Sequence, residues 1–436
     1  MNEAQFELIE IHQLQIGMFI ELDLGWMSHP FPKGSFKITS DKQIKVIQGL
    51  GLKCVRYYPG KSDLATDGSE VSVAIESGLA ACENEEVELP QHIVAEDELL
   101  RKKQNSDSLR AQQRDMALCE RRFAAAIREH KLIVAQINSK PQEAMTLCLE
   151  VINAFVSEMS MEGESAIRLL SDGMGDKASM HPVNVTIVSL LLGKSLGLQH
   201  SEMVDLGIAA FLHDIGKSKL PDRVRWLEEN FSTAEYKLYQ DHVAQGILLG
   251  KSMSLTSGAL QAIAQHHELV DGSGFPARIK GERISMPAKI LALVNRYENL
   301  CNPSRPAAAI TPHEALSLIF AQLKTRFDSV ALSAFIRMMG VYPPGSVVQL
   351  VDERYALVVS VNSSRPLKPR VVVHDPGISK YEALILDLEQ APNIGIRRSL
   401  KPTSLPMDAM EYLSPRQRIC YFFEKSNSLE SDEVAP

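Results

Sequence analysis

Apolar residues recur at helical spacing through most of the chain between residues 93 and 342. Across residues 93–135 a sparse stripe runs through densely charged sequence and comprises Leu99, Leu100, Met116, Leu118, Phe123 and Ile127. A second helix is predicted at about 141–159. Further on, a broad apolar face typical of a core helix is formed by Val183, Ile187, Leu190, Leu191 and Leu198. The pattern predicts connecting helices over 93–162 and a helical segment over 163–342. We expect the first stripe to pack within the chain, with packing on a second protomer as the alternative.

The two ends of the chain show strand patterns. In residues 1–60, two strands at 18–23 and 54–58 flank a short helix at about 40–50. In residues 343–425, short strands are predicted at 347–351, 355–361 and 370–374. Residues 61–92 are acidic and predict a linker, and residues 426–436 predict a disordered tail. The expected fold class is mainly α, with a small α+β N-terminal domain and a short β-rich C-terminal appendage.

Composition narrows the class of protein. The 45% hydrophobic and 23% charged residues describe a globular protein, and the net charge of -8 argues against a broad basic surface for nucleic acid. The acidic N-terminus has no signal-peptide core, and no apolar run is long enough to span a bilayer. The six cysteines have no paired spacing and indicate reduced thiols. We therefore expect a cytoplasmic protein that binds neither nucleic acid nor membrane.

One run places three kinds of polar side chain within about one helical turn. His213 and Asp214 come directly after an apolar stretch of sequence, and Lys217 lies four residues after His213 on the same helical face. An imidazole, a carboxylate and an ammonium suit a metal ion beside a phosphate. By itself, however, the run is weak evidence, because a His-Asp pair can also form a satisfied hydrogen bond in a core.

Further histidines in the same segment favour a metal site over a hydrogen bond in a core. His181 stands at the entrance of the apolar helix, and His242 and the pair His266-His267 lie downstream, each beside a helical pattern. The pair is followed by the loop Asp271-Gly272-Ser273-Gly274-Phe275-Pro276, whose glycines allow the backbone to approach a ligand closely. A tight turn after a helix is the structural alternative for this loop. The adjoining histidines favour a loop that walls a substrate pocket.

With these motifs in this order, residues 163–342 resemble an HD-GYP domain, a branch of the HD phosphohydrolases that hydrolyses cyclic di-GMP. The name-giving Gly-Tyr-Pro reads Gly274-Phe275-Pro276 in this chain. The resemblance implies a helical HD-type bundle that holds two divalent metal ions, iron or manganese before zinc. It implies catalytic roles for Asp214, as the residue bridging both ions, and for Lys217, as a phosphate-binding residue. The implied metal ligands are His181, His213, Asp214, His242, His266 and His267, and the implied substrate contacts are Lys217, Asp271, Gly272, Gly274, Phe275, Pro276 and, with an uncertain alignment, Arg305.

The chain departs from the family at three informative positions. The last metal ligand of the family is an Asp, where this chain has Asn295, whose amide oxygen can coordinate but brings no charge. Glu298 replaces a second Asp of the same stretch. Lys177 stands where members with three metals have a Glu, which indicates two ions at most.

Three functions stay open on this sequence. The first is a phosphodiesterase that hydrolyses cyclic di-GMP to linear pGpG, GMP or both. The second is a degenerate domain that binds cyclic di-GMP without turnover, and the third is a phosphohydrolase of another nucleotide. The N-terminal domain resembles the uncharacterised domain that precedes many HD-GYP domains, and its aromatic turn at 25–31 either binds a partner or covers a small core. A signalling protein partner and a homodimer are the assemblies that remain open.

Overall fold

The structure is a computed structural model that describes residues 7–22, 35–48, 52, 54–62, 91–160, 165–173, 175, 177–226, 231–362, 365–391 and 393–425. The chain forms two compact units, Met1–Gln112 and Gln113–Pro436. The predicted linker falls almost wholly outside the described residues. The aromatic turn at 25–31 and the tail at 426–436 fall entirely outside them.

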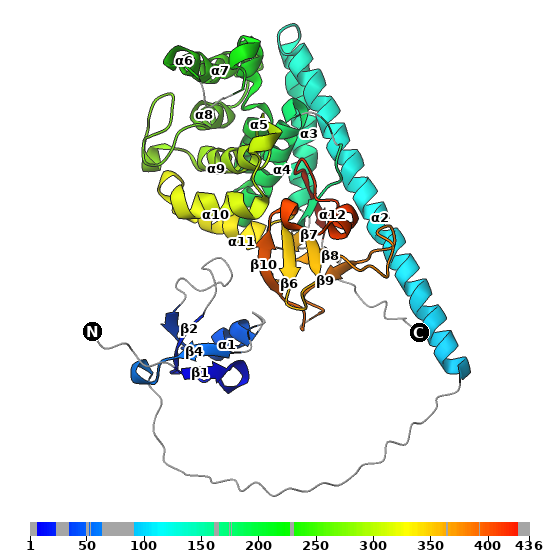
Figure 1. The fold of residues 1–436 in the computed structure, drawn as a ribbon. Helices are drawn as coiled ribbons and strands as arrows, with labels where there is room; N and C mark the ends of the chain where they lie inside the picture. Colours follow the sequence, from blue (N-terminus) through cyan, green and yellow to red (C-terminus); the bar gives the residue numbers. More distant parts are fainter. Residues whose placement is uncertain are drawn as a thin grey trace, which may run out of the picture. The chain divides into compact units, whose positions relative to one another are not determined.

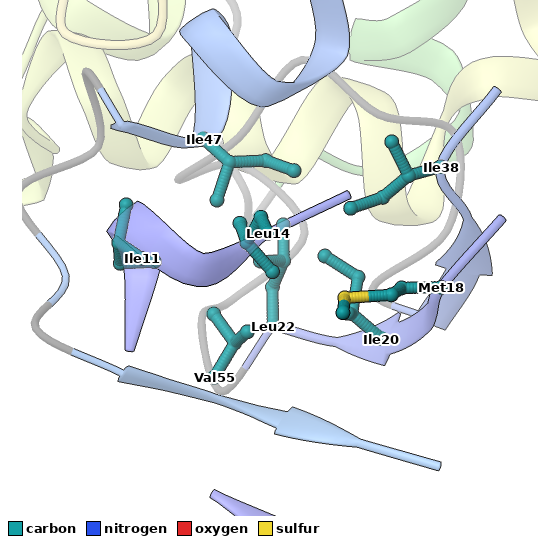
Figure 2. Close-up of a cluster of buried hydrophobic side chains, with 8 residues drawn as sticks. All are labelled: Ile11, Leu14, Met18, Ile20, Leu22, Ile38, Ile47 and Val55. Atoms are coloured by element: carbon teal, nitrogen blue, oxygen red, sulfur yellow. The ribbon is translucent and has the colours of Figure 1, made fainter. Parts of the chain in front are cut away.

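An antiparallel four-stranded sheet forms the N-terminal unit (Figure 1), in the order β1-β4-β2-β3. Its elements are β1 (Glu7–Glu10), β2 (Phe19–Glu21), β3 (Ser35–Lys37), α1 (Asp41–Gln48) and β4 (Cys54–Tyr57), with short 3-10 turns at Ile11–Gln13 and Pro59–Lys61. Figure 2 shows the eight apolar side chains of its core, which are Ile11, Leu14, Met18, Ile20, Leu22, Ile38, Ile47 and Val55. The predicted strand, helix and strand are confirmed. The strands β1 and β3 are not predicted from the sequence pattern.

The second unit is built around α4 (Lys177–Ser195), in which every residue from Ser179 to Gly193 is buried. A helix with no solvent-facing side must be covered on all sides, and α5, α9 and α11 pack directly against it. The helices of this unit are α3 (Pro141–Ser160), α5 (His200–Leu212), α6 (Thr233–Gln240), α7 (His242–Ser252), α8 (Ser257–Gln265), α9 (Met286–Cys301), α10 (Pro312–Gln322) and α11 (Ser329–Met339). Short 3-10 turns lie at η4 (Ile215–Lys219), η5 (Asp222–Val224), η6 (Gly281–Arg283), η7 (Pro306–Ala308) and η8 (Lys324–Arg326). The helical bundle is confirmed.

The long helix α2 (Gln91–Gln136) contains the boundary between the two units. Of the predicted apolar stripe, Phe123 and Ile127 are buried in the second unit, whereas Leu118 is 41% exposed. The buried face continues with His130 and Ile133. The C-terminal part of α2 therefore packs within the chain, as expected. Among the described residues, no helix is both long enough and apolar enough to cross a bilayer.

A close helix approach occurs at Gly216 of η4. A Cβ on Gly216 would lie 1.9 Å from the His242 carbonyl oxygen, which no side chain can tolerate. On the facing helix, a Cβ on Gly246 would meet Ile263 at 3.5 Å, an ordinary contact. The same added Cβ would lie 2.5 Å from the Gly246 amide nitrogen, so the backbones of η4 and α7 meet at these two glycines, and Gly216 is the one that the space does not allow to be replaced.

The C-terminal strands form one sheet with a strand from the start of the helical segment. In the path β10-β6-β7-β5-β11, β5 (Ser165–Leu169) pairs with both β7 (Tyr355–Asn362) and β11 (Tyr421–Lys425). The remaining elements are β6 (Val347–Leu350), β8 (Arg370–Val373), β9 (Ile385–Asp387), β10 (Ile396–Leu400), a 3-10 turn at Pro402–Ser404 and α12 (Met407–Leu413). The three predicted strands are present as β6, β7 and β8.

The sheet is also tied to the helical bundle by side-chain hydrogen bonds. The buried Asn184 of α4 donates to the Ile419 carbonyl at 2.9 Å and accepts from the Tyr421 amide at 2.8 Å. Asn302, at the end of α9, donates to the same Ile419 carbonyl at 2.8 Å. The helices and the C-terminal sheet therefore share one compact unit, and the proposed division at residue 342 follows composition only.

Candidate metal centre

The candidate site lies where the ends of several helices meet. The second turn of α4 supplies one histidine, the residues after α5 supply a histidine and an aspartate, and α7 and the end of α8 supply three more histidines. These side chains form two groups whose ligand atoms lie within 4.8 Å of one another: His181, His213 and Asp214, and Asp214, His242, His266 and His267. The six residues that the sequence singles out thus converge, and Asp214 belongs to both groups.

Four of the histidines have one ring nitrogen engaged by an acceptor. The Nδ1 atoms of His213, His242 and His266 donate to the backbone carbonyl three residues earlier, at 2.8, 2.5 and 2.6 Å. The Nδ1 of His181 donates to the Glu298 carboxylate. With the proton on Nδ1, each Nε2 keeps its lone pair, which is the tautomer that a metal ligand needs. Carbonyls at helix ends therefore set the orientation and tautomer of three rings, and the Glu298 carboxylate sets those of His181.

The Nε2 atoms face each other in pairs. His181 and His213 are separated by 3.1 Å at these atoms, and His242 and His266 by 3.3 Å. Two facing lone pairs repel, whereas a cation roughly 2.0–2.1 Å from each nitrogen fits between them. The buried Oδ1 of Asp214 and Nε2 of His267 have no hydrogen-bond partner among the described residues. A buried, unpaired carboxylate oxygen is costly, so this donor set fits divalent metal ions.

Asp214 lies between the two groups and presents one oxygen to each. Its Oδ2 lies 3.4 Å from His213 Nε2 and 3.6 Å from His181 Nε2. Its Oδ1 lies 3.6 Å from His242 Nε2 and 3.9 Å from His266 Nε2. This geometry suits a carboxylate that bridges two ions.

The electrostatics of the site keep the ligands in the form that binds metal. Desolvation lowers the pKa of His242 to about 4 and holds the pKa values of His266 and His267 well below their usual range. Desolvation also lowers the pKa of His181, against the attraction of Glu298. For Asp214, burial alone would raise the pKa, but the surrounding cationic and histidine groups outweigh burial and hold it well below its usual value. At neutral pH His181, His242, His266 and His267 are therefore neutral and Asp214 is charged.

Lys217 lies at the edge of this centre. Its Nζ donates to Asp214 Oδ2 at 2.6 Å and stands over two aromatic rings, 5.0 Å from the centroid of Trp226 and 5.4 Å from that of Tyr239. Burial opposes the charge, but Asp214 and Tyr239 outweigh burial and raise the pKa of Lys217. Arg225 donates to the Lys217 carbonyl at 3.2 Å and restrains its backbone. A charged ammonium is thus held beside the carboxylate shared by both groups.

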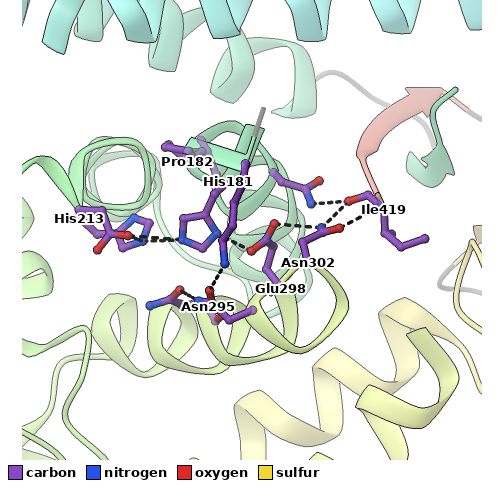
Figure 3. A network of polar contacts seen from close by, with 12 residues as sticks. His181, Pro182, His213, Asn295, Glu298, Asn302 and Ile419 are labelled. Carbon is purple, nitrogen blue, oxygen red and sulfur yellow. Dashed lines mark hydrogen bonds and ion pairs between the residues drawn. The ribbon is translucent and has the colours of Figure 1, made fainter. Parts of the chain in front are cut away.

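Asn295 is buried on α9 and belongs to a network of amides (Figure 3). Asn299, one turn on, donates to Asn295 Oδ1 at 2.6 Å and accepts from Lys177 Nζ at 3.0 Å. Glu298, on the same helix, accepts from His181 Nδ1 and from Asn302 at 3.0 Å. The Asn295 oxygen is therefore already engaged, and its role as a metal ligand stays a prediction. The sequence offers Glu298 only as a replacement for an Asp, whereas the structure gives it the task of orienting His181.

The loop at 271–276 packs on the centre through its aromatic residue. The Phe275 ring stacks on His267 with 4.4 Å between centroids, and the Phe275 amide donates to the His267 carbonyl at 3.1 Å. A Cβ on Gly274 would lie 2.4 Å from that same carbonyl oxygen, so only glycine permits this contact. Asp271 is exposed and accepts from the Ser273 amide and hydroxyl. The loop therefore adjoins the second group, as expected, while the contacts of Asp271 are local.

Glu268 is a residue of this region that the sequence pattern misses. It is 2% exposed, and its carboxylate accepts from the backbone amides of Ala277, Arg278 and Ile279 at 2.6, 3.0 and 3.1 Å. Glu268, which follows His267 directly, therefore holds residues 277–279 at the end of the loop in place. In the sequence, the only feature that points to Glu268 is its position directly after His266 and His267. Arg305 is exposed next to η7, and its substrate contact stays a prediction.

Comparison with known proteins adds independent information. Residues 164–330 match the HD domain family, and residues 7–148 match a domain of unknown function, DUF3391. The chain is 25% identical over 382 residues to a cyclic di-GMP phosphodiesterase of Pseudomonas aeruginosa, covering 85% of this chain and 86% of that protein. It is 33% identical over 153 residues to the cyclic di-GMP phosphodiesterase response regulator RpfG of Xanthomonas campestris pv. campestris, covering 34% and 40%. It is 24% identical over 180 residues to the 3'3'-cGAMP-specific phosphodiesterase 3 of Vibrio cholerae, covering 41% and 39%.

Proposed function

Because the chain is an HD-GYP family protein with a DUF3391 domain ahead of its HD domain, we propose that it is a metal-dependent phosphodiesterase that hydrolyses cyclic di-GMP to linear pGpG, GMP or both. One observation carries the proposal: two groups of buried histidines share Asp214, and the ligand atoms Asp214 Oδ1 and His267 Nε2 have no partner among the described residues. The relatives named as cyclic di-GMP phosphodiesterases support this choice of substrate.

Under this proposal each group would hold one divalent ion. The first would be held by His181, His213 and the oxygen of Asn295, the second by His242, His266 and His267, and Asp214 would contribute to both. Mostly imidazole ligands with little carboxylate and no thiolate favour iron or manganese, with zinc as a further candidate. When bound, such ions lower the pKa of water and polarise a phosphoryl oxygen.

The protein's own residues then supply position and charge. In the hydrolysis the oxygen of a water molecule bonds to phosphorus, the P–O bond to the leaving ribose breaks, and a proton of that water passes to the leaving ribose oxygen. The Lys217 ammonium neutralises the negative charge that develops on the phosphoryl oxygens during this step. Phe275, stacked on His267, forms one wall against which the substrate lies. Arg305 and the glycines of the loop would contact the remainder of the dinucleotide.

A second candidate function rests on Asn295. Its amide brings no charge, and its Oδ1 already accepts from Asn299 at 2.6 Å. The first group therefore has a single carboxylate, Asp214, where a second Asp would bind an ion more tightly. A domain that binds cyclic di-GMP without hydrolysing it is the function that this observation favours.

The test is turnover by the purified full chain. Protein loaded with Mn²⁺ or Fe²⁺ would be given cyclic di-GMP and, separately, 3'3'-cGAMP, and the products would be separated by chromatography. The proposal expects linear pGpG or GMP from cyclic di-GMP and no product from Asp214→Asn. Binding without any product would establish the receptor function, and faster hydrolysis of 3'3'-cGAMP would change the substrate.

A further inference from the structure

Lys177, at the start of α4, is a buried cation whose contacts are all with uncharged groups. It is 9% exposed. Its Nζ donates to Asn299 Oδ1 at 3.0 Å and stands 5.4 Å from the centroid of Trp226. Within the described part of the chain no carboxylate oxygen lies within ion-pair distance of it, although Glu298 and Asp214 attract it from farther away. The sequence names Lys177 only as a departure from a metal-ligand pattern.

This placement is unfavourable for folding by itself. Moving an ammonium out of water costs several kcal/mol unless an anion compensates the charge. The first turn of a helix also carries the positive end of the helix dipole, which disfavours a cation. An amide and an indole ring offset only part of this cost. A buried ammonium without a paired carboxylate is therefore better suited to an anion that arrives with a ligand.

Trp226 brings this cation next to the candidate centre. Lys217 Nζ lies 5.0 Å from the same ring centroid. The ammonium nitrogens of Lys177 and Lys217 both lie within 5.4 Å of the Trp226 centroid. The distance between the two nitrogens is therefore less than twice that value. Lys217 is neutralised by Asp214 at 2.6 Å, and Lys177 is not neutralised in this way. Trp226 is partly exposed, so the region around both lysines reaches the surface.

We propose that Lys177 binds the second, non-reacting phosphate of a cyclic dinucleotide while Lys217 faces the phosphate that is cleaved. This inference rests on the proposed function and extends it by naming a residue that recognises substrate. A cyclic dinucleotide carries two phosphodiesters across one macrocycle, and two lysines whose ammonium groups lie over one indole ring offer it two cations. A substrate with a single phosphodiester would use Lys217 alone.

The inference also accounts for the contact between Lys177 and Asn299. One ammonium proton is held by Asn299 Oδ1, which fixes the direction of the side chain. An ammonium has three donors, so the others remain for phosphate oxygens. The amide pair Asn295-Asn299 then orients a substrate-binding lysine.

The experiment compares four proteins: the parent chain, Lys177→Gln, Lys177→Arg and the control Lys219→Gln. Gln keeps an amide donor for Asn299 and removes the charge, while Arg keeps the charge. Lys219 is exposed, lies on η4 near Lys217 and donates to Asn138. For each protein we would measure the Kd for cyclic di-GMP without metal, the KM and kcat with Mn²⁺, the metal content, and the hydrolysis of bis(4-nitrophenyl) phosphate, which has one phosphodiester.

The expected result is a loss of affinity confined to the dinucleotide. Lys177→Gln should bind cyclic di-GMP about 10- to 100-fold more weakly, the range of one charge-assisted hydrogen bond. Its metal content and its rate on bis(4-nitrophenyl) phosphate should match the parent. Lys177→Arg should recover most of the affinity, and Lys219→Gln should match the parent throughout.

Two results would overturn the inference. One is unchanged binding of cyclic di-GMP by Lys177→Gln. The other is an equal loss of metal or of bis(4-nitrophenyl) phosphate hydrolysis, which would show that Lys177 acts through the architecture of α9. If the parent binds cyclic di-GMP but does not cleave it, turnover is refuted and the Kd values still decide the role of Lys177. If the parent neither binds nor cleaves it, the proposed function fails and the inference falls with it.

Discussion

Replacing Glu268 by Gln tests whether its carboxylate holds the aromatic loop against the histidines. One oxygen accepts from the Ala277 and Arg278 amides, and the other accepts from Ile279. Arg278 has a positive φ of 53°, a left-handed conformation that costs a non-glycine residue roughly 1 kcal/mol. The three hydrogen bonds compensate for this strain. Gln has the same size but carries a single acceptor oxygen and no charge.

The magnitude follows from these contacts. A hydrogen bond to a charged group contributes roughly 1.5–3 kcal/mol, and a neutral one roughly 0.5–1.5 kcal/mol. In Glu268→Gln one acceptor is lost, because the amide nitrogen faces a backbone N–H, and the two bonds that remain become neutral. We expect a loss of about 3.5–6 kcal/mol of local stability by this accounting. The loop that carries Phe275 would then leave its position on His267 for much of the time.

The assay measures the loop and the reaction separately. Trypsin cleavage at the exposed Arg278 and Lys280 should become faster in Glu268→Gln, and hydrolysis of cyclic di-GMP should fall by about 10- to 100-fold because the pocket wall is misplaced. Glu282→Gln is the matched control, since Glu282 is exposed in the same stretch. If both variants are cleaved by trypsin and hydrolyse substrate at the same rates, Glu268 does not hold the loop.

Three further predictions concern the ligands and the core. Asn295→Asp should raise metal content and hydrolysis by about 10- to 100-fold, because a second carboxylate faces the first ion; mass spectrometry and product analysis check this, and no change in either contradicts it. Lys217→Ala should lower turnover by about 100-fold while metal content stays at the parent value, and loss of metal instead would show that Lys217 supports the architecture of the site. Burial lowers the pKa of His130 to about 4, from an ordinary value of 6.5. Between pH 6.5 and 4, His130 is therefore protonated in the unfolded chain but neutral in the folded chain. As the pH falls through this window, His130 lowers the free energy of unfolding by about 3 kcal/mol in total. The free energy of unfolding, measured by urea titration of chelated protein at pH 7 and pH 4.5, should depend less on pH in His130→Gln than in the parent. An equal dependence in both proteins would refute this role of His130.

The helical segment and most of its ligands follow from local sequence. Apolar spacing predicts the buried helix that carries His181, and the adjacency of His213 and Asp214 places both at one helix end. The structure brings these residues together with the later histidines into two groups that share Asp214. This agreement has a local cause, because each ligand lies in or beside a helix whose buried face sets its direction. Whether the groups hold two ions stays a prediction.

Contacts between segments that are distant in the sequence could not be predicted from apolar spacing. Periodicity reports which face of an element is buried, but it does not report what lies opposite. Glu298 meets His181 across 117 positions of the chain, and Lys177 meets Asn299 across 122. The strand β5 is recognisable only once β7 and β11 pair with it, more than 180 residues later.

The sequence by itself determined the helical fold class, the α+β N-terminal domain and the set of chemically active side chains, because these depend on spacing within single elements. Only the tertiary structure decided which oxygen of Asp214 faces which histidines, which carbonyls fix their tautomers, and that Glu268 and Lys177 stand beside the centre. Those properties depend on the packing of helices that are remote in sequence. A buried carboxylate or ammonium becomes interpretable only when its neighbours, and the partners it lacks among the described residues, are known.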